Sequence, residues 1–246
     1  MAGCCRSFCA LFALFTLFEL VAAATSEAFA VEAVSARPPS APWTMREGLA
    51  DRLQKTSPTL NPQVLERTLT AIRCAIAGVG VADSGRARDA EPHVLALVDY
   101  SLPSSEKRLW LFDLDTERLL FHELVAHGMG SGENEAVHFS NEVGTQASSL
   151  GLFRAAETYQ GRNGYSLRLD GLEAGFNDRA RERAIVIHGA WYVDGEFLAE
   201  HGRLGRSWGC PALDIRVARQ AMTEAVTLGR KTRRGDPPCV ESCRSV

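Results

Sequence analysis

Cys210 and His188 are the residues whose types and spacing could carry out covalent chemistry. Cys210 lies in the run Gly205-Arg206-Ser207-Trp208-Gly209-Cys210-Pro211-Ala212, 22 positions after His188. A thiolate attacks a carbonyl carbon when a nearby base removes the thiol proton and N–H groups stabilise the oxyanion. The pair therefore predicts a thiol enzyme, with Cys210 as the nucleophile and His188 as the general base.

The backbone beside Cys210 indicates how the developing negative charge would be stabilised. Gly209 places no side chain before Cys210, so the N–H groups of Gly209 and Cys210 could face a carbonyl oxygen. Pro211 has no N–H group and favours an extended conformation at Cys210. A helix predicted just after this run would favour the thiolate modestly through its N-terminus.

Two other interpretations of these residues stay open. In the first, Cys210 is a buried structural thiol or a disulfide partner of Cys239 or Cys243. In the second, four residues in or beside Gly-rich loops bind zinc, namely His127, His188, His201 and Cys210. The chain contains no short ligand pair of the kind that usually marks a zinc site, which argues against the second.

Hydrophobic spacing predicts the elements that would position the pair. Apolar residues recur at helical spacing after Asn61-Pro62 up to Gly78, and again after Asp214, and both starts have capping residues. From residue 93 onward the pattern is β, with strands at 94–100, 108–114, 119–125, 150–155, 165–169 and 184–187 and a hairpin turn at 113–117. We expect a mainly β domain with a helical N-terminal segment. Residues 189–206 would be a long connecting loop, of a length that is usually functional or disordered.

The first thirty residues have the features of a secretory signal peptide. Arg6 precedes an apolar run at 8–18, and small residues that fit a cleavage site follow. The run is too short to be a spanning helix, so only an uncleaved signal would attach the chain to a membrane. We therefore expect an exported protein of the periplasm or cell envelope.

The net charge argues against nucleic acid as a partner, and the cysteines raise the question of which thiols stay reduced. The 246 residues carry a formal net charge of −3, which gives no reason to expect nucleic acid as a partner. Residues 31–60 read as a linker with a short helix. In an oxidising compartment Cys74, Cys239 and Cys243 could form disulfides, whereas Cys210 needs a local reason to stay reduced.

Several motifs, in order, resemble the murein L,D-transpeptidase catalytic domain family, a YkuD-like branch of the L,D-transpeptidases. His188-Gly189, a spacer and Ser207-Trp208-Gly209-Cys210 are similar to the family signature. Runs like those of this branch also occur at 100–110, 127–132, 148–151, 157–161, 171–173 and 205–212. The resemblance covers about residues 60–222.

The resemblance implies a YkuD-type β-sandwich or barrel-like fold over residues 61–228. It also implies peptidoglycan L,D-transpeptidation through a thioester on Cys210, with His188 as base and the Gly209 and Cys210 N–H groups as the oxyanion hole. The partners would be peptidoglycan stem peptides, and the enzyme, a monomer, would serve cell wall biogenesis and cell shape without a metal or cofactor. The alternatives are an L,D-carboxypeptidase or peptidoglycan amidase with the same site, or a cell-wall-binding domain with a degenerate site.

The chain departs from the family pattern around the nucleophile and at the C-terminus. Trp208 stands where the signature has His, and Pro211-Ala212 replaces the usual pair after the cysteine. These changes predict a different substrate pocket, contacted by Gly189, Arg206, Ser207 and Trp208. Residues 229–246 are basic and contain Pro237-Pro238, so they cannot supply the family's apolar final strand. We expect an exposed sheet edge and reduced stability.

Overall fold

The computed structural model describes residues 46–76 and 92–229, with the side chains of 226–229 excepted. The predicted signal peptide, the first part of the predicted linker, and the C-terminal tail with Cys239 and Cys243 lie outside the described residues. Within the two described ranges, no helix has the length and apolar character needed to cross a membrane.

The first sheet contains three antiparallel strands in chain order. These are β1 (Val94–Val98), β2 (Leu109–Asp113) and β3 (Arg118–Glu123). The Asp113 carboxylate accepts hydrogen bonds from the N–H groups of Asp115 and Thr116 at 2.9 and 3.1 Å, which closes the turn between β2 and β3. The three strands and the hairpin turn predicted from the sequence are confirmed.

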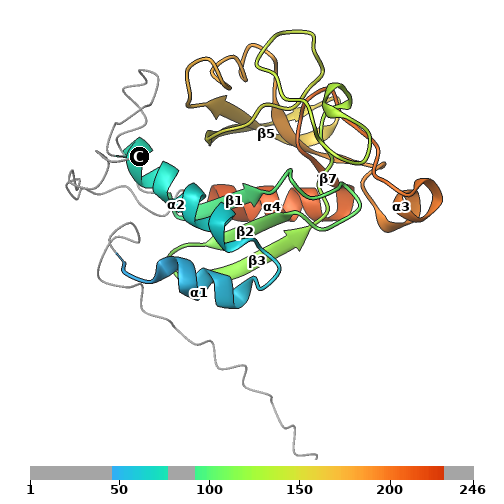
Figure 1. Cartoon of the computed structure of the whole chain (residues 1–246). Coiled ribbons are helices and arrows are strands. Elements are labelled where there is room, and N and C mark those ends of the chain that lie inside the picture. The colour runs from blue at the N-terminus through green and yellow to red at the C-terminus, as the bar shows by residue number, and fades with distance from the viewer. Residues whose placement is uncertain (1–45, 77–91, 230–246) are drawn as a thin grey trace, which may run out of the picture. The chain divides into compact units, whose positions relative to one another are not determined.

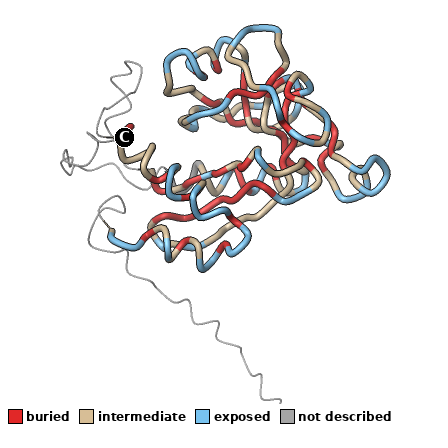
Figure 2. The backbone as a smooth tube through the Cα atoms, viewed as in Figure 1, coloured by how far each residue is buried: buried red, intermediate tan, exposed pale blue. Residues whose placement is uncertain are grey.

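All five residues of β2 are buried because both faces of the strand are covered. Successive side chains point to opposite faces of a sheet. Trp110 and Phe112 pack against the helices α1 (Leu49–Thr56) and α2 (Pro62–Ile76), whereas Leu109 and Leu111 pack against α4 (Ile215–Gly229). Figure 1 shows α1, α2 and α4 beside the first sheet, and Figure 2 shows that buried residues concentrate in the strands.

The N-terminal helices belong to the same core as the first sheet. Asn61 caps α2 by accepting a hydrogen bond from the Gln63 N–H at 2.9 Å, which confirms the predicted start of that helix. Leu49 and Leu53 of α1 join the same buried cluster as Leu65 and Leu69 of α2. The short helix predicted before residue 61 corresponds to α1, which is part of the folded core.

The second sheet contains four strands and carries the candidate active site. They are β4 (Phe153–Gly161), β5 (Gly164–Gly171), β6 (Val186–Ala190) and β7 (Ala212–Asp214), in that order, and only β6 and β7 pair in parallel. Leu167 of β5 and Leu213 of β7 share a buried cluster with β2 and α4, so α4 joins both sheets. The mainly β class with a helical N-terminal segment is confirmed. β4, however, extends six residues beyond the predicted strand end at 155.

The connection from β6 to β7 is not one continuous loop, so that prediction was wrong in part. It contains α3 (Gly195–His201), whose first turn is capped by the Asp194 carboxylate accepting from the Phe197 N–H at 2.7 Å. Gly202 ends the helix in the left-handed conformation. A short 3-10 turn, η2 (Met129–Ser131), lies in the segment that faces the turn before β7.

Candidate active site

His188 lies on β6, and Cys210 lies in the turn that leads into β7, the parallel neighbour of β6 in the second sheet. The register pairs His188 of β6 with Ala212 of β7, so Cys210 lies two residues before the partner of His188. α4 begins directly after β7, and the Asp214 carboxylate accepts a hydrogen bond from the Arg216 N–H at 2.8 Å at its start. The sequence prediction that a helix follows the nucleophile is confirmed.

The sulfur of Cys210 faces the backbone that leads into β6. Its S–H group donates to the Ala184 carbonyl at 3.8 Å, and the Val186 N–H donates to the sulfur. Burial raises the pKa of the Cys210 thiol above its ordinary value, while the Val186 N–H and the Arg183 charge oppose that rise. The thiol is therefore protonated at neutral pH and needs a base before it can attack a carbonyl.

His188 has the tautomer that a general base requires. Its Nδ1 lies 2.9 Å from the Gly189 carbonyl oxygen, and because a carbonyl can only accept, Nδ1 carries the proton and Nε2 the lone pair. Burial lowers the pKa of His188, so the ring is neutral at pH 7. Nε2 makes no hydrogen bond with any described residue, although His188 is only 4% exposed, so its lone pair is free to accept a proton.

The turn around Cys210 is stabilised by its own residues. Gly209 adopts φ 113°, which a side chain would strain. The Gly209 N–H donates to the Ser207 hydroxyl at 3.1 Å, and that hydroxyl donates to the Cys210 carbonyl at 2.6 Å. Of the two N–H groups predicted for the oxyanion hole, that of Cys210 makes no hydrogen bond with any described residue, whereas that of Gly209 is already engaged.

Two distant segments hold this turn in place. The Ser207 N–H donates to the His127 carbonyl at 2.9 Å, and the Met129 N–H donates to the Ser207 carbonyl at 2.8 Å. The buried Ser148 hydroxyl accepts from the Gly128 N–H at 3.0 Å and donates to the Gly209 carbonyl at 3.2 Å. The orientation of the peptide that precedes Cys210 therefore depends on Ser148.

His127 belongs to a buried polar network beside the turn. Its Nδ1 accepts from Arg108 Nη2 at 2.7 Å, which leaves Nε2 to donate to the Gly132 carbonyl at 3.4 Å. Burial and then the Arg108 charge lower the pKa of His127 to about 4. The Arg108 guanidinium is fully buried, donates to the Val125 and Leu102 carbonyls, and lies over the ring of Tyr100.

The structure does not bring together the four residues of the zinc interpretation. His201 is on α3, where its ring stacks on Phe197 and its Nδ1 bonds to the Phe197 carbonyl. Both nitrogens of His127 are used by protein groups. Among residues 46–76 and 92–229, no three metal-ligating side chains converge.

The four residues predicted to contact the substrate differ in exposure and in the protein groups that they contact. Trp208 is 69% exposed, whereas Ser207 is buried and its hydroxyl is used within the turn. The Arg206 guanidinium pairs with Glu133 at 2.6 Å, so its charge is partly neutralised. A Cβ added to Gly189 would lie 3.1 Å from Ile215 Cα, so this glycine packs against α4 and contributes its carbonyl to His188.

Sequence reasoning missed three residues that interact electrostatically with the thiol, namely Tyr100, Arg183 and Tyr192. Burial, and then the negative charge of Cys210 when it is ionised, raise the pKa of Tyr192 to about 12. Arg183 lies in a turn that contains three arginines within five residues, and nothing in the sequence distinguishes it from Arg179 and Arg181. Tyr100 lies at the end of a predicted strand and in a run that resembles the family, and neither pattern marks it as a residue near the thiol.

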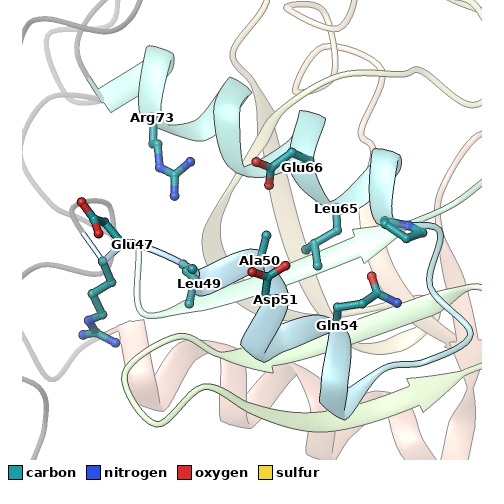
Figure 3. Close-up of a pocket in the computed structure, with 11 residues that line it drawn as sticks. Glu47, Leu49, Ala50, Asp51, Gln54, Leu65, Glu66 and Arg73 are labelled. Carbon is teal, nitrogen blue, oxygen red and sulfur yellow. The ribbon is translucent and has the colours of Figure 1, made fainter.

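A pocket of about 500 Å³ lies elsewhere, between α1 and α2 (Figure 3). Charged side chains, including Glu47, Asp51, Glu66 and Arg73, line it together with Leu49 and Leu65. Neither Cys210 nor His188 contributes to it, so it is separate from the candidate active site.

Comparison with known protein families agrees with this geometry. A family model described as the L,D-transpeptidase catalytic domain, of the YkuD_2 type, matches residues 57–228, a range that includes both sheets, His188 and Cys210. No curated protein and no solved structure matches the chain significantly. Because the family model covers more than half of the sequence, the chain belongs to the YkuD-type L,D-transpeptidase catalytic domain family, whose members are cysteine-dependent enzymes that act on peptidoglycan.

Proposed function

We propose that the chain is a peptidoglycan L,D-transpeptidase that forms cross-links between stem peptides through a thioester on Cys210. The observation that carries this proposal is the ring of His188. Its Nδ1 proton is fixed on the Gly189 carbonyl and its Nε2 is unpaired among the described residues, while the protonated thiol of Cys210 lies two residues before Ala212, the partner of His188 on the neighbouring strand. A nucleophile that needs a base thus lies at the start of the strand that pairs with the one carrying a base in the correct tautomer.

The first half-reaction forms the acyl-enzyme. His188 Nε2 removes the proton from the Cys210 thiol as the sulfur attacks a carbonyl carbon of the donor stem peptide. The Cys210 N–H, which makes no other hydrogen bond to the described residues, stabilises the oxyanion. The C–N bond then breaks, the imidazolium of His188 returns its proton to the leaving amine, and the acyl group stays on sulfur.

The second half-reaction transfers the acyl group. An amine of a neighbouring stem attacks the thioester, a new C–N bond forms, and the C–S bond breaks. His188 accepts the proton of the attacking amine and returns it to the thiolate of Cys210. Water in place of the amine would give hydrolysis, which is the reaction of the alternative carboxypeptidase or amidase.

The site of action follows from the substrate. Peptidoglycan stem peptides are found outside the cytoplasmic membrane, and the predicted signal peptide at residues 1–30 would deliver the chain there. We therefore place the enzyme in the periplasm or cell envelope, with a role in cell wall biogenesis and cell shape.

Incubation of the purified chain with muropeptides, followed by mass spectrometry of the products, tests the proposal. Cross-linked dimers are expected from the native chain, and none from Cys210→Ala, which removes one sulfur from a partly exposed position and should leave the melting temperature nearly unchanged. Shortened monomers would identify a hydrolase. The absence of any product, or equal product from Cys210→Ala, would reject the proposal.

A further inference from the structure

Arg183 lies beside Cys210 but takes no part in the two half-reactions of the proposed transpeptidation. Its Nη2 is 3.3 Å from the position that a Cβ on Gly209, the residue before the nucleophile, would occupy. The residues that follow it also face the sulfur, since Ala184 accepts from the thiol and Val186 donates to it. The segment 183–186 therefore lines one side of the reacting atom.

The Arg183 guanidinium is held rigidly by uncharged groups. Its Nη1 donates to the Ser140 carbonyl at 2.6 Å and to the Ser149 hydroxyl at 2.5 Å, and its Nη2 donates to the Ala147 carbonyl at 2.5 Å. In the described part of the chain, no carboxylate lies within ion-pair distance of it, and Glu142 acts on it only at longer range. Its positive charge is thus fixed in position and not neutralised by a direct partner.

We propose that Arg183 is the counter-charge of the Cys210 thiolate, so that the turn before β6 supplies a fixed positive charge to the reacting sulfur. The proposal rests on the proposed function only in taking Cys210 as the nucleophile. It assigns Arg183 an electrostatic effect on the sulfur in addition to its contacts with the segment 140–149.

The other groups that face the sulfur cannot supply this charge. Tyr100 and Tyr192 interact with Cys210 from the turns that follow β1 and β6, but burial raises both of their pKa values, so both phenols are neutral at pH 7. His188, on the adjacent strand, is neutral at that pH until it takes the thiol proton. Among residues 46–76 and 92–229, Arg183 is the one cation that interacts electrostatically with the thiol.

The pH dependence of Cys210 alkylation by iodoacetamide tests the proposal, because only the thiolate reacts at an appreciable rate. The full chain would be used, and the mass of the peptide that contains Cys210 would separate this thiol from the other cysteines. We expect Arg183→Gln to raise the midpoint pH by about one unit, which makes alkylation about tenfold slower at a fixed pH below the midpoint. Arg183→Lys keeps a cation and should recover most of the native midpoint.

Arg181→Gln is the matched control. It removes the same charge from the same turn, but Arg181 pairs with Glu157 and Asp170 rather than facing the sulfur. Its midpoint should equal that of the native chain. A folded Arg183→Gln chain with the native midpoint would overturn the proposal.

Arg183→Lys decides the question if Arg183→Gln does not fold. A midpoint raised by a unit or more in Arg183→Lys would mean that Arg183 only ties the segment 140–149 to the turn, and the proposal would be wrong. Alkylation requires no peptidoglycan. A chain that shows the shift but makes no cross-links would therefore reject the proposed function and leave the role of Arg183 intact.

Discussion

His188 is set for proton transfer by one hydrogen bond to its own strand. The Gly189 carbonyl fixes the ring tautomer, and the burial that lowers the pKa of His188 also raises the pKa of the Cys210 thiol. Both partners are therefore uncharged before the substrate arrives. The ion pair forms only when the thiol is used, where the Arg183 charge and the Val186 N–H can stabilise the thiolate.

Replacing His188 by Gln removes the base and keeps a polar side chain of similar length. We expect the rate of cross-linking at pH 7 to fall by about 10²–10⁴, the usual contribution of a general base. The loss should diminish as the pH approaches the raised pKa of the thiol, where solvent can deprotonate the sulfur. His201→Gln, on the exposed face of α3, is the control, and its pH–rate profile should match that of the native chain.

Ser148→Ala removes the hydroxyl that joins Gly128 to Gly209. The Gly128 N–H and the Gly209 carbonyl would both lose a buried hydrogen-bond partner. We expect the free energy of unfolding to fall by about 1–3 kcal/mol and kcat to fall with little change in KM. Urea denaturation measures the first effect. Thr145→Ala, whose hydroxyl makes a surface hydrogen bond, should stay within about 0.5 kcal/mol of the native chain. Equal losses in the two variants would contradict the assignment.

β6, the strand that carries His188, packs closely on α4, the helix that follows Cys210. Gly189 lets the two approach, since a Cβ there would lie 3.1 Å from Ile215 Cα and 3.3 Å from Ala218 Cβ. β7, at the edge of its sheet, is also covered in part, because Ala212 and Ala126 exchange backbone hydrogen bonds at 2.9 and 3.3 Å.

Gly189→Ala should therefore move α4 away from β6. We expect a loss of about 1–3 kcal/mol in the free energy of unfolding, as for other overpacked positions. Gly195→Ala is the matched control, because a Cβ at that position, the first residue of α3, has no atom within 4 Å. It should be neutral or more stable by about 0.4–1 kcal/mol. Chemical denaturation of both variants measures the difference, and equal stabilities would show that the close approach at Gly189 is unimportant.

The elements that the sequence predicts best have strong periodicity and a capping residue. α2 and α4 meet both conditions, with Asn61 and Asp214 at their starts. The end of β4 was missed because its residues from Glu157 to Gly161 are mostly polar or small, and α3 was missed because seven residues give too short a pattern. Arg183 could not be predicted, since its partners lie 34 to 43 positions away in the chain.

Across the whole molecule, buried neutral histidines link stability to acidity. His127 and His188 both have folded-state pKa values below 6.5, that of His127 being about 4, so the unfolded chain takes up their protons first as the pH falls. These two histidines therefore lower the free energy of unfolding as the pH decreases from about 6.5 toward 4, and they have no such effect well above pH 6.5. For His127 the full loss in the free energy of unfolding is about 3 kcal/mol.

Urea denaturation between pH 7 and pH 5 should therefore show a falling free energy of unfolding. His127→Gln, if it folds, should make the slope shallower and leave the part due to His188, since Gln does not titrate, whereas His138→Gln at an exposed position should keep the native slope. Measurements would stop at pH 5, because carboxylates with lowered pKa values, such as Glu117 and Asp170, add their own effect at lower pH. A free energy of unfolding that stays constant over this range would contradict the prediction.

The turn that holds Cys210 is joined to segments far from it in the chain. Ser148 and Gly209 are 61 positions apart, and Ala126 bonds to Ala212 across a longer stretch. Contacts of such long range form after local ones, because chain entropy must be lost first. During refolding, helix and hairpin signals should thus recover before the thiol becomes shielded from alkylating reagents. A newly made chain would pass through a period in which Cys210 is open to unwanted oxidation before it has its catalytic partners.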